Sequence, residues 1–269
     1  MTKNGLVTDE ARELYRTEGY MIFEKVIPDD MLEMLRKECS YFHGYIDGRM
    51  DAEGKTTSSI NHKGKRYFIA NEYRKSANLW RFIYHPIMAE IATAALGETV
   101  FLFHEQWVLK GAYQGMKFSW HQDSGYVKSG NTESTHRPYL TCWCPIDDVS
   151  EENGTVYLLP HSRGGTSHQI FDHEQEAETN DLVGYRGDDP GIPLNLPAGS
   201  IAAFTSYNFH RSGTNSTPNM RRVYLPQYSA TPILNDDGTH AGEAVPFVAG
   251  GEIVYNPEGD IEVPYRQPE

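Results

Sequence analysis

Apolar residues recur at helical spacing in the first third of the chain, and residues with capping chemistry bound these stretches. Thr8 can cap a helix that Gly19 ends, because a hydroxyl accepts from free helix N–H groups and glycine readily adopts a left-handed conformation. A second helix is predicted to begin at Pro28, and a third to run from Pro86 to the residue before Gly97. The N-terminal third is therefore predicted to be mainly helical.

From Thr99 onward the pattern changes to short apolar runs separated by turn signals, which is typical of strands. The predicted strands, including a short early one, are residues 20–23, 100–110, 116–121, 138–146, 155–159, 200–209 and 222–230. Two polar segments interrupt the pattern. Residues 44–66 are dotted with glycine and are predicted to form a long loop or lid, and residues 161–192 form a long insertion.

Helices first and many short strands afterwards favour a mainly β fold with N-terminal helices, such as a β-sandwich or jelly roll. The length of 269 residues suits a single domain with an all-β core. Within it we expect a helical buttress and lid loop over residues 1–98 and a β core over residues 99–230. A C-terminal extension over residues 231–269 follows.

Composition narrows the class of protein. Hydrophobic residues make up 39% of the chain, which is enough for a buried core. The net charge of −13 argues against a nucleic-acid partner, since binding phosphates needs a basic face. The sequence shows neither the apolar stretch of a signal peptide nor a run of membrane-spanning length. With only three cysteines, we expect a cytoplasmic protein, monomeric or homodimeric, without membrane association.

The densest candidate chemistry lies at His121 and Asp123. On an extended segment alternate side chains project to the same side, so both can reach one metal ion. His210 is the candidate third ligand, because it ends an apolar run over residues 201–209 that would carry it to the rim of a sheet cavity. Two imidazoles and one carboxylate leave three octahedral positions open, and this facial triad is diagnostic of non-haem Fe(II) oxygenases. Zinc would prefer a four-coordinate site.

The open positions suit a 2-oxo acid together with O₂. A 2-oxo acid chelates iron through its keto oxygen and its first carboxylate, and O₂ takes the last position. Its distal carboxylate needs a buried counter-charge, for which arginine provides a planar bidentate clamp. Arg221 stands at the head of a predicted strand and fits this role, whereas Arg222 is expected to point outside from the opposite face.

Four motifs surround these residues: Trp120-His-Gln-Asp123, Trp143-x-x-Ile-Asp-Asp-Val-Ser-Glu-Glu-Asn-Gly-Thr155, Leu159-Pro-His-Ser162 and His210-x-Ser-Gly-x-Asn-x-Thr-Pro-x-x-Arg221. Together they resemble the phytanoyl-CoA dioxygenase family, and the ectoine hydroxylases among its members. The resemblance spans about residues 11 to 228. It implies a double-stranded β-helix (a jelly roll, cupin-like) in which 2-oxoglutarate is oxidatively decarboxylated to succinate while a substrate is hydroxylated.

The resemblance also implies roles for individual residues. The implied iron ligands are His121, Asp123 and His210. The implied co-substrate residues are Arg221, Ser212, Trp143, Lys110 and Gln106, of which the last two share one face of their predicted strand. Halogenases of this family replace the carboxylate ligand with a small residue so that chloride can bind iron. Because Asp123 is present, hydroxylation or a related oxidation is favoured over halogenation.

The expected reaction is hydroxylation of an aliphatic C–H bond in a small soluble metabolite, with release of succinate and CO₂. The alternatives are an oxygenase that performs desaturation or ring chemistry, a non-catalytic cupin-like metal-binding or sensor protein of the same fold, and a zinc hydrolase. Residues 44–76 and 161–192 are expected to close over the substrate. The cations Arg66, Arg74 and Lys75 in the first of these segments suggest a polar or anionic molecule.

Overall fold

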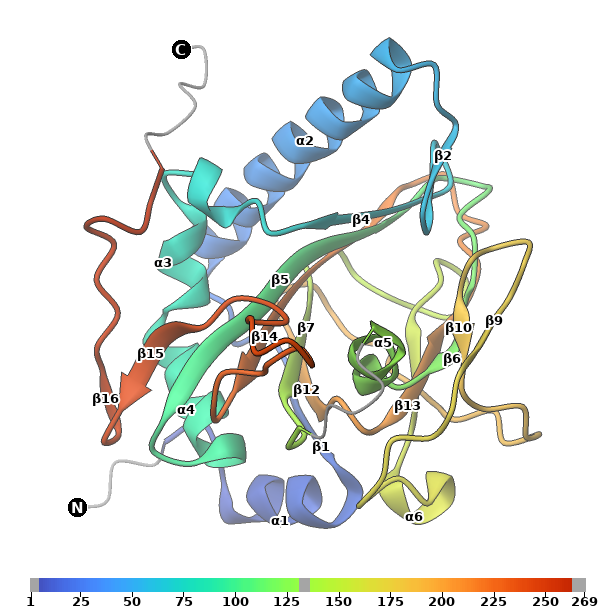
Figure 1. Cartoon of the computed structure of the whole chain (residues 1–269). Helices are drawn as coiled ribbons and strands as arrows, with labels where there is room; N and C mark the ends of the chain where they lie inside the picture. The colour runs from blue at the N-terminus through green and yellow to red at the C-terminus, as the bar shows by residue number, and fades with distance from the viewer. Residues whose placement is uncertain (1–4, 131–135, 263–269) are drawn as a thin grey trace.

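The computed structural model describes residues 5–130 and 136–262, and two antiparallel β-sheets form its centre (Figure 1). The larger sheet has the strand order β1 (Tyr20–Phe23), β12 (Ile201–Thr205), β7 (Leu140–Pro145), β14 (Arg221–Ser229), β5 (Val100–Lys110), β4 (Arg66–Ala70), β3 (Asn61–His62) and β2 (Thr57–Ser58). The smaller sheet has the order β11 (Ile192–Pro193), β8 (Val156–Leu159), β13 (Phe209–Ser212) and β6 (Phe118–His121).

Side chains of both sheets meet in one apolar cluster between them. Phe204 and Val223 contribute from the larger sheet, and Val156 and Leu158 from the smaller one. Three minor strand pairings lie outside these two paths. The strands involved are β15 (Val245–Ala249), which pairs with β5, β16 (Glu252–Ile253), which pairs with β15, and the separate pair β9 (Glu174–Gln175) and β10 (Leu182–Val183). The predicted mainly β fold with N-terminal helices is confirmed.

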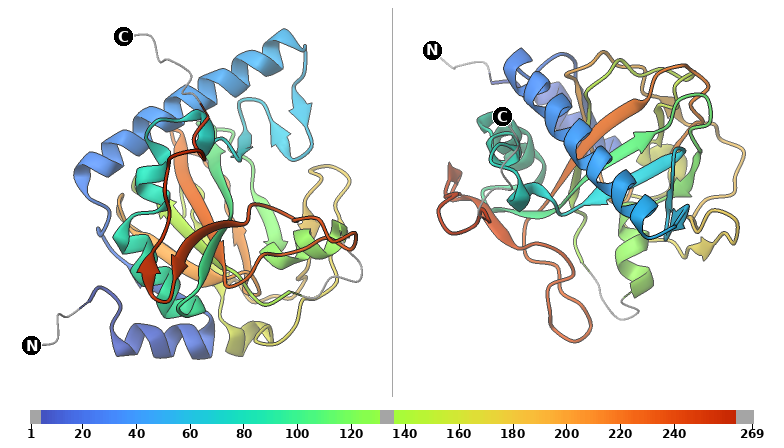
Figure 2. Two further views of the ribbon diagram at one scale, coloured as in Figure 1. Left: turned by 60° about the vertical axis from the view of Figure 1, so that its left-hand side comes forward. Right: turned by 90° about the horizontal axis from the view of Figure 1, so that it is seen from above.

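Helices cover the outer face of the larger sheet (Figure 2). The helices on this side are α2 (Asp29–Ala52), α3 (Leu79–Ile83) and α4 (Pro86–Leu96). Phe42 of α2 and Ile91 of α4 share a buried cluster with Trp107 and Tyr224 of the sheet. The remaining helices are α1 (Asp9–Glu18), α5 (Asp123–Gly130), α6 (His161–Gly164) and the 3₁₀ turn Tyr73–Lys75. Across residues 5–130 and 136–262, none of the helices has the length and apolar character to cross a membrane.

The first and third predicted helices begin and end where their caps indicate. Oγ1 of Thr8 accepts a hydrogen bond from the backbone N–H of Ala11 at 3.2 Å. Gly19 closes α1 with φ at +85°, a left-handed conformation that glycine adopts without a Cβ penalty. The predicted helix from Pro86 to the residue before Gly97 is α4, with the same bounds.

The predicted loop over residues 44–66 is wrong in its first part. The helix α2 runs without interruption to Ala52, because Ile46 and Met50 continue the buried stripe of its earlier turns. The hairpin of β2 and β3 and the first residue of β4, Arg66, then occupy much of the remainder. Gly44 and Gly48 suggested a loop, but a buried apolar stripe outweighs the low helix propensity of exposed glycines.

The predicted strand over residues 200–209 is also wrong, because the chain changes sheets within it. The strand β12 ends at Thr205, and a turn with a 3.0 Å hydrogen bond from the Asn208 N–H to the Thr205 carbonyl leads into β13. His210 therefore lies on the smaller sheet, one residue into β13. By contrast, the predicted strand over residues 100–110 is confirmed at both ends as β5.

Candidate metal centre and co-substrate pocket

Three side chains with metal-ligand chemistry meet where β6, β13 and α5 come together. The strands β6 and β13 are paired, with His210 directly opposite His121. Oδ1 of Asp123 lies 3.5 Å from Nε2 of His121 and 3.4 Å from Nε2 of His210. One ligand atom from each residue lies within 4.8 Å of the other two, so the three can hold one ion. The tertiary structure thus brings together the three predicted ligands.

The chain path between the first two ligands differs from the prediction. His121 and Asp123 were expected to alternate along one strand, but β6 ends at His121 and α5 begins at Asp123. Gln122, which lies between them, is fully buried. Its side chain donates to the Tyr207 carbonyl and accepts from the Phe171 N–H, both at 2.7 Å. These hydrogen bonds anchor a strand-to-helix turn, and the turn directs both ligands to one point.

Backbone carbonyls set the tautomers of both histidines. Nδ1 of His121 is 2.8 Å from the Ser119 carbonyl, and Nδ1 of His210 is 3.2 Å from the Asn208 carbonyl. Because a carbonyl only accepts, each Nδ1 carries the proton and each Nε2 offers its lone pair toward Asp123. Burial, followed by the nearby His210, lowers the pKa of His121. A neutral imidazole with a free Nε2 is the form that binds a metal.

Two neutral side chains hold the carboxylate ligand. Oδ2 of Asp123 accepts from Oγ1 of Thr141 at 2.5 Å and from Nε2 of Gln227 at 2.9 Å. Burial opposes ionisation of Asp123, but the two histidines beside it lower its pKa overall. The sequence analysis missed both supporting residues. Their signal was a polar residue inside a mostly buried strand, where a hydrogen-bond partner is needed.

Arg221 is a buried cation without a carboxylate partner among the residues that the structure describes. Its side chain is almost completely buried, and it donates to the carbonyls of Val108 at 3.2 Å and Gly154 at 3.1 Å. Its Nε has no hydrogen-bond partner within the described chain. Burial lowers the pKa of Arg221 to about 9. An unpaired buried guanidinium is costly, and a bound carboxylate would relieve that cost.

Arg222 lies on the other face of β14, as predicted. It forms an ion pair with Asp147, with 2.7 Å between Nη2 of Arg222 and Oδ1 of Asp147 and a second hydrogen bond from Nε. About a quarter of each side chain is exposed. Of these two arginines, only Arg221 is buried and without a carboxylate partner among the described residues. Only Arg221 can therefore offer a buried positive charge to a ligand.

A cavity of about 340 Å³ joins the metal ligands to Arg221. Ser212, Trp143 and Gln106, the predicted co-substrate residues besides Arg221 and Lys110, also line it. The ring of Trp143 lies 5.9 Å from the guanidinium carbon of Arg221. One cavity therefore contains three donor atoms for a metal and a free cation for an anionic ligand, which is the arrangement that a chelating dicarboxylate requires.

Lys110 is the predicted residue that the structure places apart from the cavity wall. It is buried and paired in register with Arg221 on the neighbouring strand, and its Nζ donates to the Met116 carbonyl. Burial lowers its pKa well below the ordinary value, and the charges of Arg221 and Arg66 lower it further. Lys110 lies beside Arg221, and its role in binding the co-substrate stays a prediction.

Comparison with known proteins identifies the family of the chain. The model of the phytanoyl-CoA dioxygenase family matches residues 15–223, so the chain belongs to that family. It is 20% identical over 246 residues to the peroxisomal phytanoyl-CoA dioxygenase of Rattus norvegicus, an alignment that covers 85% of this chain and 70% of the relative. The protein is therefore an enzyme of the dioxygenase class, as predicted.

Solved structures with the same fold include proteins with bound 2-oxoglutarate. The EctD protein of S. alaskensis, solved with 2-oxoglutarate and 5-hydroxyectoine, aligns with a TM-score of 0.69 and 16% identity over 91% of this chain and 88% of its own. An epimerase of nogalamycin biosynthesis, solved with Fe³⁺ and alpha-ketoglutarate, aligns with a TM-score of 0.61 and 19% identity over 90% and 95%. These likenesses confirm the predicted jelly-roll fold.

Proposed function

We propose that the protein is an Fe(II)- and 2-oxoglutarate-dependent dioxygenase that hydroxylates an aliphatic C–H bond of a small soluble metabolite and releases succinate and CO₂. The observation that carries the proposal is the unpaired, buried Arg221 in the same cavity as the two histidines and the carboxylate. A metal-binding or sensor protein without catalysis would have no use for this cation. Its position therefore also supports oxidation over the non-catalytic alternative.

In this proposal His121, Asp123 and His210 would hold iron at the wall of the cavity. When bound, iron and 2-oxoglutarate supply the O₂-dependent oxidation of a C–H bond. Arg221 binds the distal carboxylate of 2-oxoglutarate, because its free Nε and its buried position favour an anion there. Ser212, Trp143, Gln106 and Lys110 are the further residues that we assign to the co-substrate.

The residues that line the cavity indicate whether the reacting part of the substrate is charged. Its charged lining residues are Asp123, Arg211 and Arg221. Asp123 is assigned to the metal and Arg221 to 2-oxoglutarate. The guanidinium of Arg211 packs over the ring of Tyr157, with its carbon 3.7 Å from the ring centre. Much of the remaining wall is aromatic or aliphatic. We therefore propose an uncharged reacting group, because an unpaired charge in such a wall is unfavourable.

Arg66, Arg74 and Lys75 suggested a polar or anionic substrate, and their contacts give no support to the anionic alternative. Arg66 pairs with Asp181, Arg74 with Glu243 and Asp260, and Lys75 with Glu72. Each positive charge therefore has a carboxylate partner within the protein.

Location and assembly remain predictions, namely a cytoplasmic monomer or homodimer built as a single domain.

Exchange of Arg221 for leucine tests the proposal. Loss of one partner from a buried charge pair costs about 2–5 kcal/mol, so the affinity for 2-oxoglutarate should fall roughly 30-fold or more. Slow succinate formation without a substrate should fall with it, while metal affinity is kept. The measurements are calorimetric titration with 2-oxoglutarate under anaerobic conditions and a succinate assay with Fe(II).

Arg222→Leu is the matched control, because it removes the same side chain from the other face of β14. It should keep both 2-oxoglutarate binding and succinate formation. A third variant, His210→Ala, should lose metal binding and succinate formation together. Fe(II)-loaded protein that forms no succinate with any substrate set, or Arg221→Leu protein that forms it at the normal rate, would contradict the proposed function.

A further inference from the structure

Arg66 is the most completely hydrogen-bonded cation that the described residues contain, and it belongs to no ligand site. It is the first residue of β4 and is fully buried. Its Nε donates to the Ile60 carbonyl at 3.1 Å, and its two Nη atoms donate to the carbonyls of Lys117 at 2.8 Å and Thr179 at 3.2 Å. Asp181 accepts the other two N–H groups at 2.7 and 3.2 Å. All five guanidinium donors are thereby satisfied.

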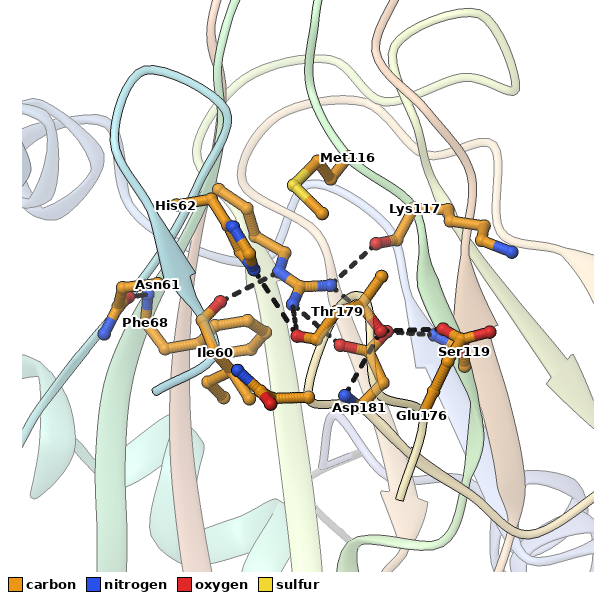
Figure 3. A network of polar contacts seen from close by, with 12 residues as sticks. Ile60, Asn61, His62, Phe68, Met116, Lys117, Ser119, Glu176, Thr179 and Asp181 are labelled. Atoms are coloured by element: carbon orange, nitrogen blue, oxygen red, sulfur yellow. Dashed lines mark hydrogen bonds and ion pairs between the residues drawn. The ribbon is translucent and has the colours of Figure 1, made fainter. Parts of the chain in front are cut away.

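These contacts join three segments that are far apart in the sequence (Figure 3). Ile60 lies between β2 and β3, Lys117 immediately precedes β6, and Thr179 and Asp181 lie between β9 and β10. The first and third segments also contact each other directly, through the 3.0 Å hydrogen bond from Nδ2 of Asn180 to the Ser59 carbonyl and the 3.4 Å contact of His62 Nε2 with the Thr179 carbonyl. Arg66 is a buried junction of the two segments expected to close over the substrate.

A hydrogen-bonded path leads from this junction to a metal ligand. Oδ2 of Asp181 accepts from the Ser119 N–H at 3.0 Å, and the Ser119 carbonyl accepts from Nδ1 of His121 at 2.8 Å. A second path runs through an aromatic ring. The guanidinium carbon of Arg66 lies 4.8 Å from the ring centre of Phe118, and that ring meets the His121 ring edge-on at 4.6 Å. Both paths end on the same imidazole.

The same cation also supports one wall of the cavity. Phe68, Phe118 and Ile60 line the cavity, and Arg66 contacts all three. The rings of Phe68 and Phe118 pack on each other at 5.0 Å between centres. A change at Arg66 would therefore alter the orientation of His121 and the wall beside it together.

We propose that Arg66 and Asp181 are positioning residues that fix His121 as a metal ligand and hold the Phe68–Phe118 wall in place. The inference rests on the proposed function in so far as His121 binds the metal. A buried ion pair is a poor source of stability, because the cost of removing both charges from water offsets their attraction. The pair instead fixes the position of the Ser119 backbone, because the Asp181 carboxylate accepts from both the Arg66 guanidinium and the Ser119 N–H.

The double variant R66M/D181L separates positioning from stability. Apolar side chains of similar volume often replace a buried ion pair without loss of stability, so any fall in the thermal midpoint should come from the backbone groups that lose their partners. The Ser119 N–H, however, loses its acceptor, and His121 loses its fixed orientation. We expect Co(II) affinity to fall about 10–100-fold, as is typical when support of a metal ligand is removed, and the visible Co(II) spectrum to shift. The affinity for 2-oxoglutarate, set at Arg221, should fall less than that for the metal.

R163M/D189L is the control for the insertion. Arg163 and Asp189 form a partly exposed two-contact ion pair within the same insertion. This variant should keep the Co(II) affinity and spectrum of the unchanged protein. Asp181→Asn is the milder variant if R66M/D181L fails to fold, because it keeps an oxygen acceptor. It should still shift the Co(II) spectrum, since Arg66 loses its counter-charge.

The outcomes distinguish this inference from the proposed function. An unchanged Co(II) affinity and spectrum in folded R66M/D181L, or in Asp181→Asn when the double variant does not fold, would overturn the positioning role. Equal effects in R163M/D189L would overturn it too, because they would show only that a loosened insertion disturbs the site. Failure of the unchanged protein to bind Co(II) would instead overturn the proposed function itself.

Discussion

Asp123 is held by more of the surrounding structure than its position in a short polar triplet suggests. Thr141 and Gln227 bind its outer oxygen and each other, with 2.9 Å between Nε2 of Gln227 and Oγ1 of Thr141. The inner oxygen is thereby left for the two histidines. Such outer hydrogen bonds orient a carboxylate before the metal arrives, and part of the metal affinity therefore resides in residues that never touch the ion.

Thr141→Val tests this support, because the substitution is nearly isosteric and removes only the hydroxyl, which donates to Asp123 and accepts from Gln227. Metal affinity should fall about 10–100-fold, while 2-oxoglutarate binding to the metal-loaded protein is affected less. Competition titration with Co(II) measures the change. Thr155→Val is the control, since this equally buried hydroxyl donates to the Leu194 carbonyl instead of a ligand. Equal losses in both variants would show that the effect comes from general packing.

At the scale of the element, α2 shows how a buried stripe decides between helix and loop. Its exposed face carries Gly44 and Gly48, and in the sequence alone these glycines indicate a loop. Its buried face carries Phe42, Ile46 and Met50 against the larger sheet. Burial of those side chains contributes more than the glycines cost, so the helix continues through them.

Gly48→Ala tests that the helix extends this far. A Cβ at Gly48 would meet no heavy atom within 4 Å, so the alanine should raise the free energy of unfolding by about 0.5–1 kcal/mol. Gly54→Ala is the opposite control. Its Cβ would also find open space, but φ is +64°, and the left-handed conformation should make alanine destabilising by about 1 kcal/mol. Urea unfolding of both variants measures the difference, and a destabilising Gly48→Ala would contradict the helix.

For the molecule as a whole, the layers separate the reactive site from the core that supports it. The strand β5 belongs to both, because alternate residues face opposite sides. Gln106 faces the cavity, whereas Glu105 and Trp107 are buried on the side covered by helices. One oxygen of Glu105 accepts from the backbone N–H groups of Glu72 and Tyr73 at 2.5 and 3.0 Å. Burial raises the pKa of Glu105 to about 7.

This buried carboxyl predicts a pH dependence of global stability. The folded protein holds a proton that the unfolded chain, with an ordinary pKa of 4.5, releases, so stability falls as pH rises from about 4.5 to 7. The loss attributable to Glu105 amounts to roughly 3 kcal/mol. In Glu105→Gln this loss should be absent. Urea unfolding of both proteins at pH 4.5 and pH 8 measures it, and a stability difference between them that does not change with pH would contradict the prediction.

The sequence by itself determined the features that depend on residue type and local spacing. The caps of α1, the bounds of β5 and the donor types of His121 and Asp123 are of this kind, because local hydrogen bonds and alternation determine them. The Arg221 motif belongs here too, since its spacing from His210 is a property of the chain. Family membership follows from such patterns.

Only the tertiary structure decided which distant residues meet. Thr141 and Gln227 contact Asp123, and Arg66 pairs with Asp181, across many residues of the chain, and no local pattern encodes such contacts. The change of sheet after Thr205 is likewise decided by pairing with β6 and β8. Periodicity reports which side of an element is buried, whereas the identity of the partner depends on how whole elements pack.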